Sequence, residues 1–160
     1  VLDDRRGHEV TTFASGDSVV PGRHVETVPQ ALRPLGYAGD SLPYMQLTLH
    51  EVLARATEFD LIHSHMEWAS LLLARVSPVP VVTTFHGRLD LPDLVPLYRT
   101  FDEVPVVSIS DAQRAPRPVA TLASPPGRGL RQRLGCSRRR APTRRGPARF
   151  IAGASRAARP

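Results

Sequence analysis

The chain has 160 residues, a length that suits one domain with a sizeable core. It carries a formal net charge of +6 and one cysteine, Cys136, which excludes an internal disulfide. No apolar run approaches the roughly 20 residues that span a bilayer, and no signal-peptide pattern opens the chain. We therefore expect a cytoplasmic protein without a transmembrane segment.

The charge is distributed unevenly along the chain. Residues 1–114 hold 9 basic and 15 acidic residues, a net charge of −6, whereas residues 115–160 hold 12 basic residues and no acidic one. All 21 basic residues are arginine, which together with the heavy use of Ala, Pro and Gly indicates a GC-rich gene. The composition predicts two regions, 1–114 and 115–160.

The first residues predict the end of a helix and then two strands. Gly7 has the place of a helix C-cap, so we expect the natural start of the protein to lie before Val1. Strands are predicted around 10–13 and at 23–28, with a loop at 15–22. Apolar residues at helical spacing predict a helix over 44–60, with Ser41 as its N-cap and Pro43 in its first turn.

The following residues alternate between short strands and helices. Strands are predicted at 60–63, 80–85 and 105–109, helices at 66–76 and 91–101, and Asp111 as the N-cap of a further helix. The strands are apolar runs, which is typical of parallel strands covered on both faces. We therefore expect an α/β fold with a Rossmann-like parallel sheet.

The pattern stops at Ala115. Arg, Pro, Ala and Gly make up 33 of the 46 residues at 115–160, and no periodicity remains. Such a segment buries too little apolar surface to offset its ordering entropy. We expect this basic C-terminal tail to be disordered.

Polar residues follow three of the predicted strands, and the carboxyl ends of parallel strands share one edge of a sheet, where ligands bind. The three strand ends are His63-Ser64-His65, Thr84-Phe85-His86-Gly87-Arg88 and Ser108-Ile109-Ser110-Asp111. Together they predict a crevice whose donors suit a phosphate or a sugar hydroxyl.

Each of these features alone has an ordinary structural explanation. His86 before a glycine is typical of a turn, and Ser108 and Ser110 suit a strand end and a helix cap. His63 and His65 share a strand face, but no third ligand stands at a recognisable spacing, so we expect no metal. Trp68 and Tyr98 are expected to serve core or subdomain packing. It is the coincidence of three strand ends that favours a functional site.

Four segments, "RRGHEVTTFASGDS", "FDLIHSHMEW", "PVVTTFHGRLDLPDLVPLYRTF" and "VPVVSISDAQR", resemble in order and spacing the N-terminal domain of family 4 glycosyltransferases. The resemblance covers residues 1–114. It implies retaining enzymes of the GT-B architecture, in which two Rossmann-like domains face each other across a cleft and a nucleotide sugar is the donor substrate. No cofactor and no metal is implied.

The resemblance also implies roles for single residues. His86 corresponds to a catalytic histidine beside the anomeric carbon and phosphates of the donor. His65, Gly87, Arg88 and Ser110 correspond to substrate-binding positions, Gly87 because a residue without a side chain lets the backbone approach closely. In the mechanism implied, the donor's own phosphate assists the incoming hydroxyl, and the protein stabilises the leaving diphosphate.

The chain departs from the family pattern at both ends. The family's first strand is expected before Val1, and its second domain, which supplies the nucleotide pocket, is expected after residue 114. The tail at 115–160 matches neither, and its composition is that of GC-rich DNA translated out of frame. We therefore interpret the chain as a glycosyltransferase fragment that is inactive by itself.

Two alternatives remain open from the sequence. The arginine-rich tail, with runs such as Arg138-Arg139-Arg140, would neutralise nucleic-acid phosphates, although its one aromatic residue, Phe150, offers little base stacking. The chain would then be a nucleic-acid-binding protein, whereas the glycosyltransferase interpretation predicts no specific nucleic-acid partner. The other alternative is a half-domain completed by a partner. The oligomeric state, the donor and the acceptor are not predicted.

Overall fold

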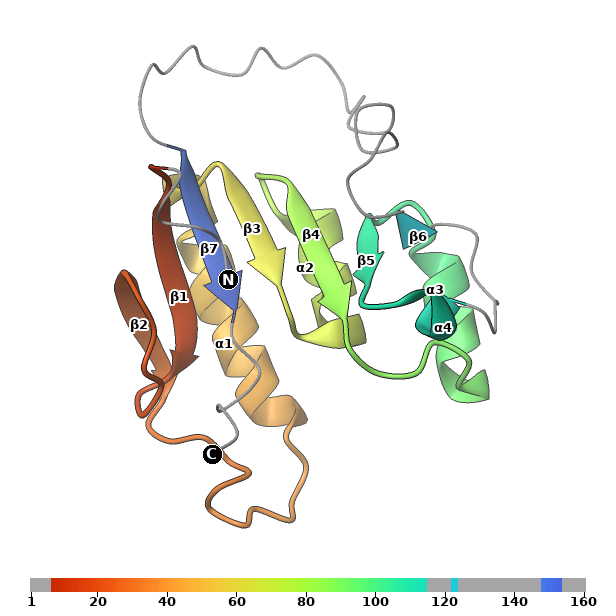
Figure 1. The fold of residues 1–160 in the computed structure, drawn as a ribbon, viewed down its shortest axis with the longest axis horizontal. Helices are drawn as coiled ribbons and strands as arrows, with labels where there is room; N and C mark the ends of the chain where they lie inside the picture. The colour runs from red at the N-terminus through yellow and green to blue at the C-terminus, as the bar shows by residue number, and fades with distance from the viewer. Residues whose placement is uncertain (1–6, 115–121, 124–147, 154–160) are drawn as a thin grey trace.

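The computed structural model describes residues 7–114, 122–123 and 148–153. Within these residues seven strands form one sheet, in which every neighbouring pair is parallel (Figure 1). The strand order is β2-β1-β7-β3-β4-β5-β6. The strands are β1 (Glu9–Ser15), β2 (Arg23–Val28), β3 (Leu61–Ser64), β4 (Val81–Phe85), β5 (Val106–Ser108), β6 (Leu122–Ala123) and β7 (Arg149–Gly153). The predicted Rossmann-like α/β sheet is confirmed.

The described helices connect successive strands. They are α1 (Leu42–Ala54), α2 (Leu71–Val76), α3 (Val95–Thr100) and α4 (Asp111–Arg114), with 3₁₀ turns at Ala56–Glu58, Glu67–Ser70 and Pro92–Leu94. The helix predicted over 44–60 ends at Ala54, and the helix predicted over 66–76 begins as a 3₁₀ turn. Ser41 occupies the N-cap of α1, but the side-chain bond to the helix comes from Asp40, whose Oδ1 accepts from Leu42 N at 2.9 Å.

The predicted N-cap of α4 is displaced by one residue. Asp111 is the first residue of the helix, and the hydroxyl of Ser110 accepts from the Gln113 amide at 3.1 Å. A serine followed three residues later by glutamine is the pattern of a capping box. The ordinary explanation of Ser110 as a helix cap is therefore confirmed.

Two hydrophobic clusters lie on the same side of the sheet. The first joins α1 to the strands around β7, and its members include Phe13, Leu49, Val52, Ile62 and Ile151. The second joins α2 and α3 to β4 and β5, and consists of Leu71, Phe85, Leu89, Tyr98, Val104 and Val106. Of the two aromatic residues expected in core or subdomain packing, Tyr98 belongs to the second cluster and Trp68 is 37% exposed.

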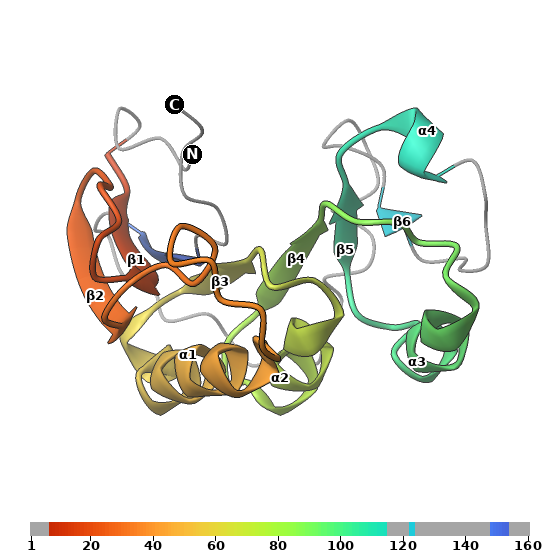
Figure 2. The same cartoon turned by 90° about the horizontal axis from the view of Figure 1, so that it is seen from below.

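The sheet is covered by helices mainly on one face. Figure 2 shows α1, α2 and α3 on the same side of the sheet. In the part of the chain that the structure describes, the remaining helix, α4, follows the carboxyl end of β5. The sequence predicted helices on both faces of the sheet. Among the described residues, helices α1, α2 and α3 cover one face.

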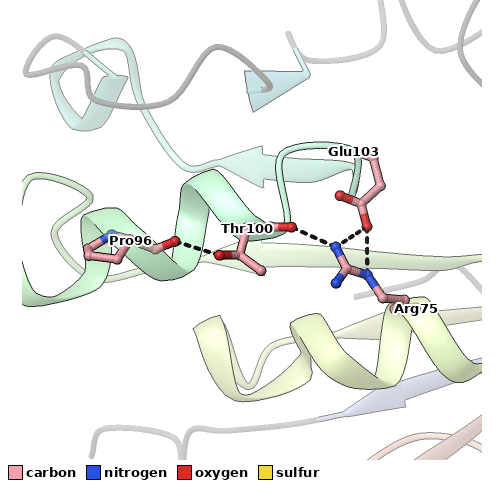
Figure 3. A network of polar contacts seen from close by, with 4 residues as sticks. All are labelled: Arg75, Pro96, Thr100 and Glu103. Atoms are coloured by element: carbon pink, nitrogen blue, oxygen red, sulfur yellow. Dashed lines mark hydrogen bonds and ion pairs between the residues drawn. The ribbon is translucent and has the colours of Figure 1, made fainter.

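An arginine ties α2 to α3 on the outside of the second cluster (Figure 3). Arg75 donates to the carbonyl of Thr100 at 2.6 Å and to Oε1 of Glu103 at 2.9 Å from Nε. Its guanidinium also lies 4.1 Å from the centroid of the Phe101 ring. Because Glu103 stands just before β5, these contacts hold the α3–β5 connection against α2.

The expectation that residues 115–160 are disordered is wrong at Arg149–Gly153. This segment is β7, which lies between β1 and β3 near the middle of the sheet. The prediction of disorder used the average composition of the whole tail and overlooked the short sequence RFIAG. Its Ile151 is 1% exposed and belongs to the first cluster. Residues 122–123 also join the sheet, beside β5. The rest of the tail, including Arg138-Arg139-Arg140, lies outside the described residues.

We predict that Ile151→Ala lowers the free energy of unfolding by about 2–5 kcal/mol, because it removes a fully buried side chain from the first cluster. The control is Val19→Ala, at a fully exposed loop position, which is expected to change stability by less than about 0.5 kcal/mol. Urea denaturation of both variants measures the difference. An effect of Ile151→Ala as small as that of the control would contradict the position of β7.

Candidate functional site

The ends of β3, β4 and β5 meet at one edge of the sheet because all three strands run in the same direction. Ser64 is in register with Thr83, and Phe85 with Ser108. His65 and His86 each come one residue after their strand. The structure therefore brings these two histidines to adjacent strand tips.

The two histidines contact each other directly. Nδ1 of His65 and Nε2 of His86 share a hydrogen bond at 2.9 Å, and the ring centroids are 5.2 Å apart. One of these nitrogens carries the proton and the other accepts it, since a hydrogen bond needs one donor and one acceptor. One proton thus lies in the bond between two half-buried rings.

A third histidine stands behind this pair. The His63 ring lies 4.4 Å from that of His65, and its Nε2 bonds to the hydroxyl of Thr84 at 2.8 Å. Burial, and next the charges of His63 and His86, lower the pKa of His65 to about 4. The pKa of His63 is also lowered, mainly by burial. His65 is therefore neutral at pH 7.

Glu67 fixes the tip of β4, a role that the sequence analysis missed. Its Oε1 accepts from the backbone amides of His86 at 2.7 Å and of Gly87 at 3.0 Å. Glu67 has a φ of 54°, a conformation that costs a non-glycine residue about 1–3 kcal/mol and requires support from its surroundings. The signal for this role in the sequence was the position of Glu67, two residues after His65 at the end of a strand.

Gln113 fixes the same tip from the other side and was also missed. Its Nε2 donates to the carbonyls of Phe85 at 3.1 Å and of Gly87 at 2.5 Å, while its Oε1 accepts from the amide of Ile109 at 2.9 Å. It therefore joins the ends of β4 and β5. The capping-box spacing after Ser110 was the signal in the sequence.

The other predicted site residues lie around this pair. Arg88 is exposed, and its guanidinium makes two bonds to the carboxylate of Asp90, at 2.8 and 2.9 Å. This partner lowers the pKa of Asp90. Ser110 is exposed and caps α4. A Cβ at Gly87 would lie 3.4 Å from Oε2 of Glu67, an ordinary contact, so the fold itself does not require glycine there.

Two further features bear on what this edge can bind. Among the residues that the structure describes, no group of three His, Cys, Asp or Glu side chains is arranged to hold a metal ion. A hollow of about 340 Å³ lies at the opposite, amino edge of the sheet, and its lining includes Glu9, Arg23, Glu58 and Arg149. The hollow is therefore separate from the histidine pair.

A parallel α/β sheet with its polar side chains gathered at the carboxyl edge defines a Rossmann-like domain, the class in which ligands bind at that edge. The sequence model of Glycosyltransferase Family 4 matches residues 4–123 of the chain. The chain belongs to this family, and the resemblance found in its sequence is confirmed. No curated protein matches the chain. In the described residues, no helix is long and apolar enough to cross a membrane.

We predict that Glu67→Ala destabilises the protein by about 1–3 kcal/mol, because two amides lose a charged acceptor. Glu67→Gln is the matched control, since its amide oxygen can accept the same two bonds, and it should cost less than about 1 kcal/mol. Urea denaturation gives the free energies, and hydrogen exchange reports the amides of His86 and Gly87. Equal protection of these amides in both variants would contradict the role assigned to Glu67.

The lowered pKa of His65 predicts a loss of stability in acid. The ordinary pKa of about 6.5 applies in the unfolded chain, so between pH 6.5 and 4 the unfolded state binds a proton at this residue that the folded state does not. The free energy of unfolding should therefore fall as the pH drops through this window. His65→Gln should reduce the fall, whereas His50→Gln, at an exposed position of α1, should not. Urea denaturation at several pH values measures both, and equal slopes in the two variants would refute the prediction.

Proposed function

We propose that the carboxyl edge of this sheet is one wall of a sugar-transfer site, at which a nucleotide-sugar donor gives its sugar to an acceptor hydroxyl. The observation that carries the proposal is the His65–His86 pair at adjacent strand tips, in a chain that belongs to Glycosyltransferase Family 4. Glycosyltransferase-like function is supported at the level of the family. The donor, the acceptor and the roles of single residues are part of the proposal.

In this proposal His86 lies beside the anomeric carbon and the diphosphate of the donor. The bond from the anomeric carbon to the phosphate oxygen breaks, the diphosphate leaves, and the acceptor oxygen forms the new bond on the same face. The proton of the acceptor hydroxyl passes to the leaving phosphate. The proton shared by His65 and His86 stays in their bond, and an outer ring nitrogen of the pair would donate its own proton to the diphosphate and stabilise the negative charge that develops there.

The contacts of the β4 tip assign the other residues distinct tasks. Glu67 already occupies the amides of His86 and Gly87, so Gly87 would serve by its small size instead of its N–H. Arg88 would exchange Asp90 for a phosphate oxygen, which its planar guanidinium can bind with two parallel bonds. The Ser110 hydroxyl accepts from Gln113 and retains its own proton to donate to a sugar hydroxyl.

Binding to the histidine pair can be tested apart from turnover. In the intact chain labelled at histidine, UDP-glucose or glucose 1-phosphate at millimolar concentration should shift the ring signals of His65 and His86 saturably. The signals of His50, which lies on the exposed side of α1, should stay unchanged. His86→Ala should abolish the response of His65. Shifts that are absent, or that persist in His86→Ala, would overturn the site.

Turnover gives a second readout with a different expectation. We predict that the chain by itself transfers no labelled sugar from a nucleotide sugar, because the described residues form one wall only. Transfer that His86→Ala leaves untouched would refute both this prediction and the catalytic role of His86.

The alternative of nucleic-acid binding stays a prediction from the sequence, since most of the tail lies outside the described residues.

A further inference from the structure

Strand β7 is far from its neighbours in sequence and central in space. It pairs with β1 from Glu9↔Arg149 to Phe13↔Gly153, and with β3 from Leu61↔Phe150 to His63↔Ala152. Figure 1 shows β7, at the blue end of the colour range, between the red β1 and the yellow β3. Arg149 is separated by 140 residues from Glu9, at the start of β1, and by 89 residues from Asp60, which precedes β3.

The first residue of β7 is held by two carboxylates. The backbone amide of Arg149 donates to Oδ2 of Asp60 at 2.7 Å. The side-chain Nε of Arg149 donates to Oε2 of Glu9 at 2.8 Å. Backbone bonds continue the pairing, from the Asp60 amide to the Arg149 carbonyl at 2.8 Å and from the Glu9 amide to the Ala148 carbonyl at 3.0 Å. The Arg149 side chain therefore meets one complementary charge, Glu9, whereas Asp60 binds the backbone of the strand.

The following positions select side chains by size. Ile151 is 1% exposed and belongs to the cluster of Phe13 and Ile62, which come from the two flanking strands. Phe150 lies on the alternate face, where its ring meets that of His8 edge-on at 4.7 Å between centroids. The strand then ends in two small residues, Ala152 and Gly153. The pattern is basic, aromatic, aliphatic, small, small.

The two strands that flank β7 are also held by contacts that do not involve β7. β1 pairs with β2, and β3 pairs with β4. Leu49 and Val52 of α1 belong to the same cluster as Phe13 and Ile62, so α1 packs beneath both flanking strands. Without β7, β1 and β3 would present facing rows of unpaired N–H and C=O groups, which are a template for an added strand.

We propose that the gap between β1 and β3 is a strand-binding slot, and that its occupant, Arg149–Gly153, is exchangeable for an extended peptide with the same pattern of side chains. The contacts described above between β7 and the slot are all non-covalent and non-local. Affinity comes from the backbone bonds to both neighbours and to Asp60, and selectivity from Glu9 at the Arg149 side chain and the buried place of Ile151. This slot is distinct from the proposed sugar-transfer edge.

The test starts from the full chain with a specific protease site introduced between residues 130 and 140 and cleaved after folding. We expect the C-terminal piece to remain bound in size-exclusion chromatography. A fluorescent peptide of residues 147–154, PARFIAGA, should then replace it in a saturable way, seen by anisotropy. Peptides with Arg149→Glu or Ile151→Asp should bind at least about tenfold weaker, since tenfold corresponds to 1.4 kcal/mol, and a scrambled peptide should not bind.

Two results would overturn the proposal. One is loss of the C-terminal piece on cleavage with no change in the melting temperature of the rest. The other is binding of the scrambled peptide as tight as that of the native one. In the uncleaved chain, hydrogen exchange of Ile151→Asp provides an independent measurement. Faster exchange confined to β1 and β3 supports the slot, whereas unchanged exchange in these strands refutes it.

Discussion

The sheet depends on the backbone pairing of β7 with the strands on both of its sides. A buried N–H or C=O group without a partner costs free energy comparable to a lost hydrogen bond, and β1 and β3 each turn one edge toward β7. Strands β2 and β1 form one part of the sheet, and β3 to β6 form the other. The parts are joined by β7 and by the cluster beneath it, in which Ile151 contacts the core that α1 covers. A segment of five residues thus joins the two parts into a single sheet.

The geometry of the candidate site follows from this arrangement. Because β3 is paired on one side with β7 and on the other with β4, its carboxyl end is fixed beside that of β4, and His65 reaches His86. Glu67 holds the β4 tip through its amides and Gln113 holds it through its carbonyls. The two histidines therefore stand on a support that is bonded from both sides, as a preorganised site requires.

The sequence predicted what depends on local pattern. The apolar runs located β3, β4 and β5 to within a residue, and polar residues at strand ends indicated His65 and His86. Features that depend on distant contacts were not predictable. RFIAG is too short to stand out in an arginine-rich tail, and only the carboxylates and core of remote strands make it a strand. Likewise, Glu67 gains its role from a tip 19 residues away, and Ser110 replaced Asp111 as cap because its hydroxyl reaches Gln113.

The electrostatics of the histidine pair connect the structure to the proposed chemistry. Burial lowers the pKa of His65 to about 4, so His65 carries no charge at neutral pH. An opposite charge brought within a few ångströms favours the protonated form and raises the pKa of a histidine. In the proposed function, a diphosphate bound at this edge would favour the protonated form of His65, and by linkage its affinity would rise as the pH falls toward the pKa of His65. The burial that keeps His65 neutral in the free chain is therefore what would let its charge respond to a diphosphate in the proposed function.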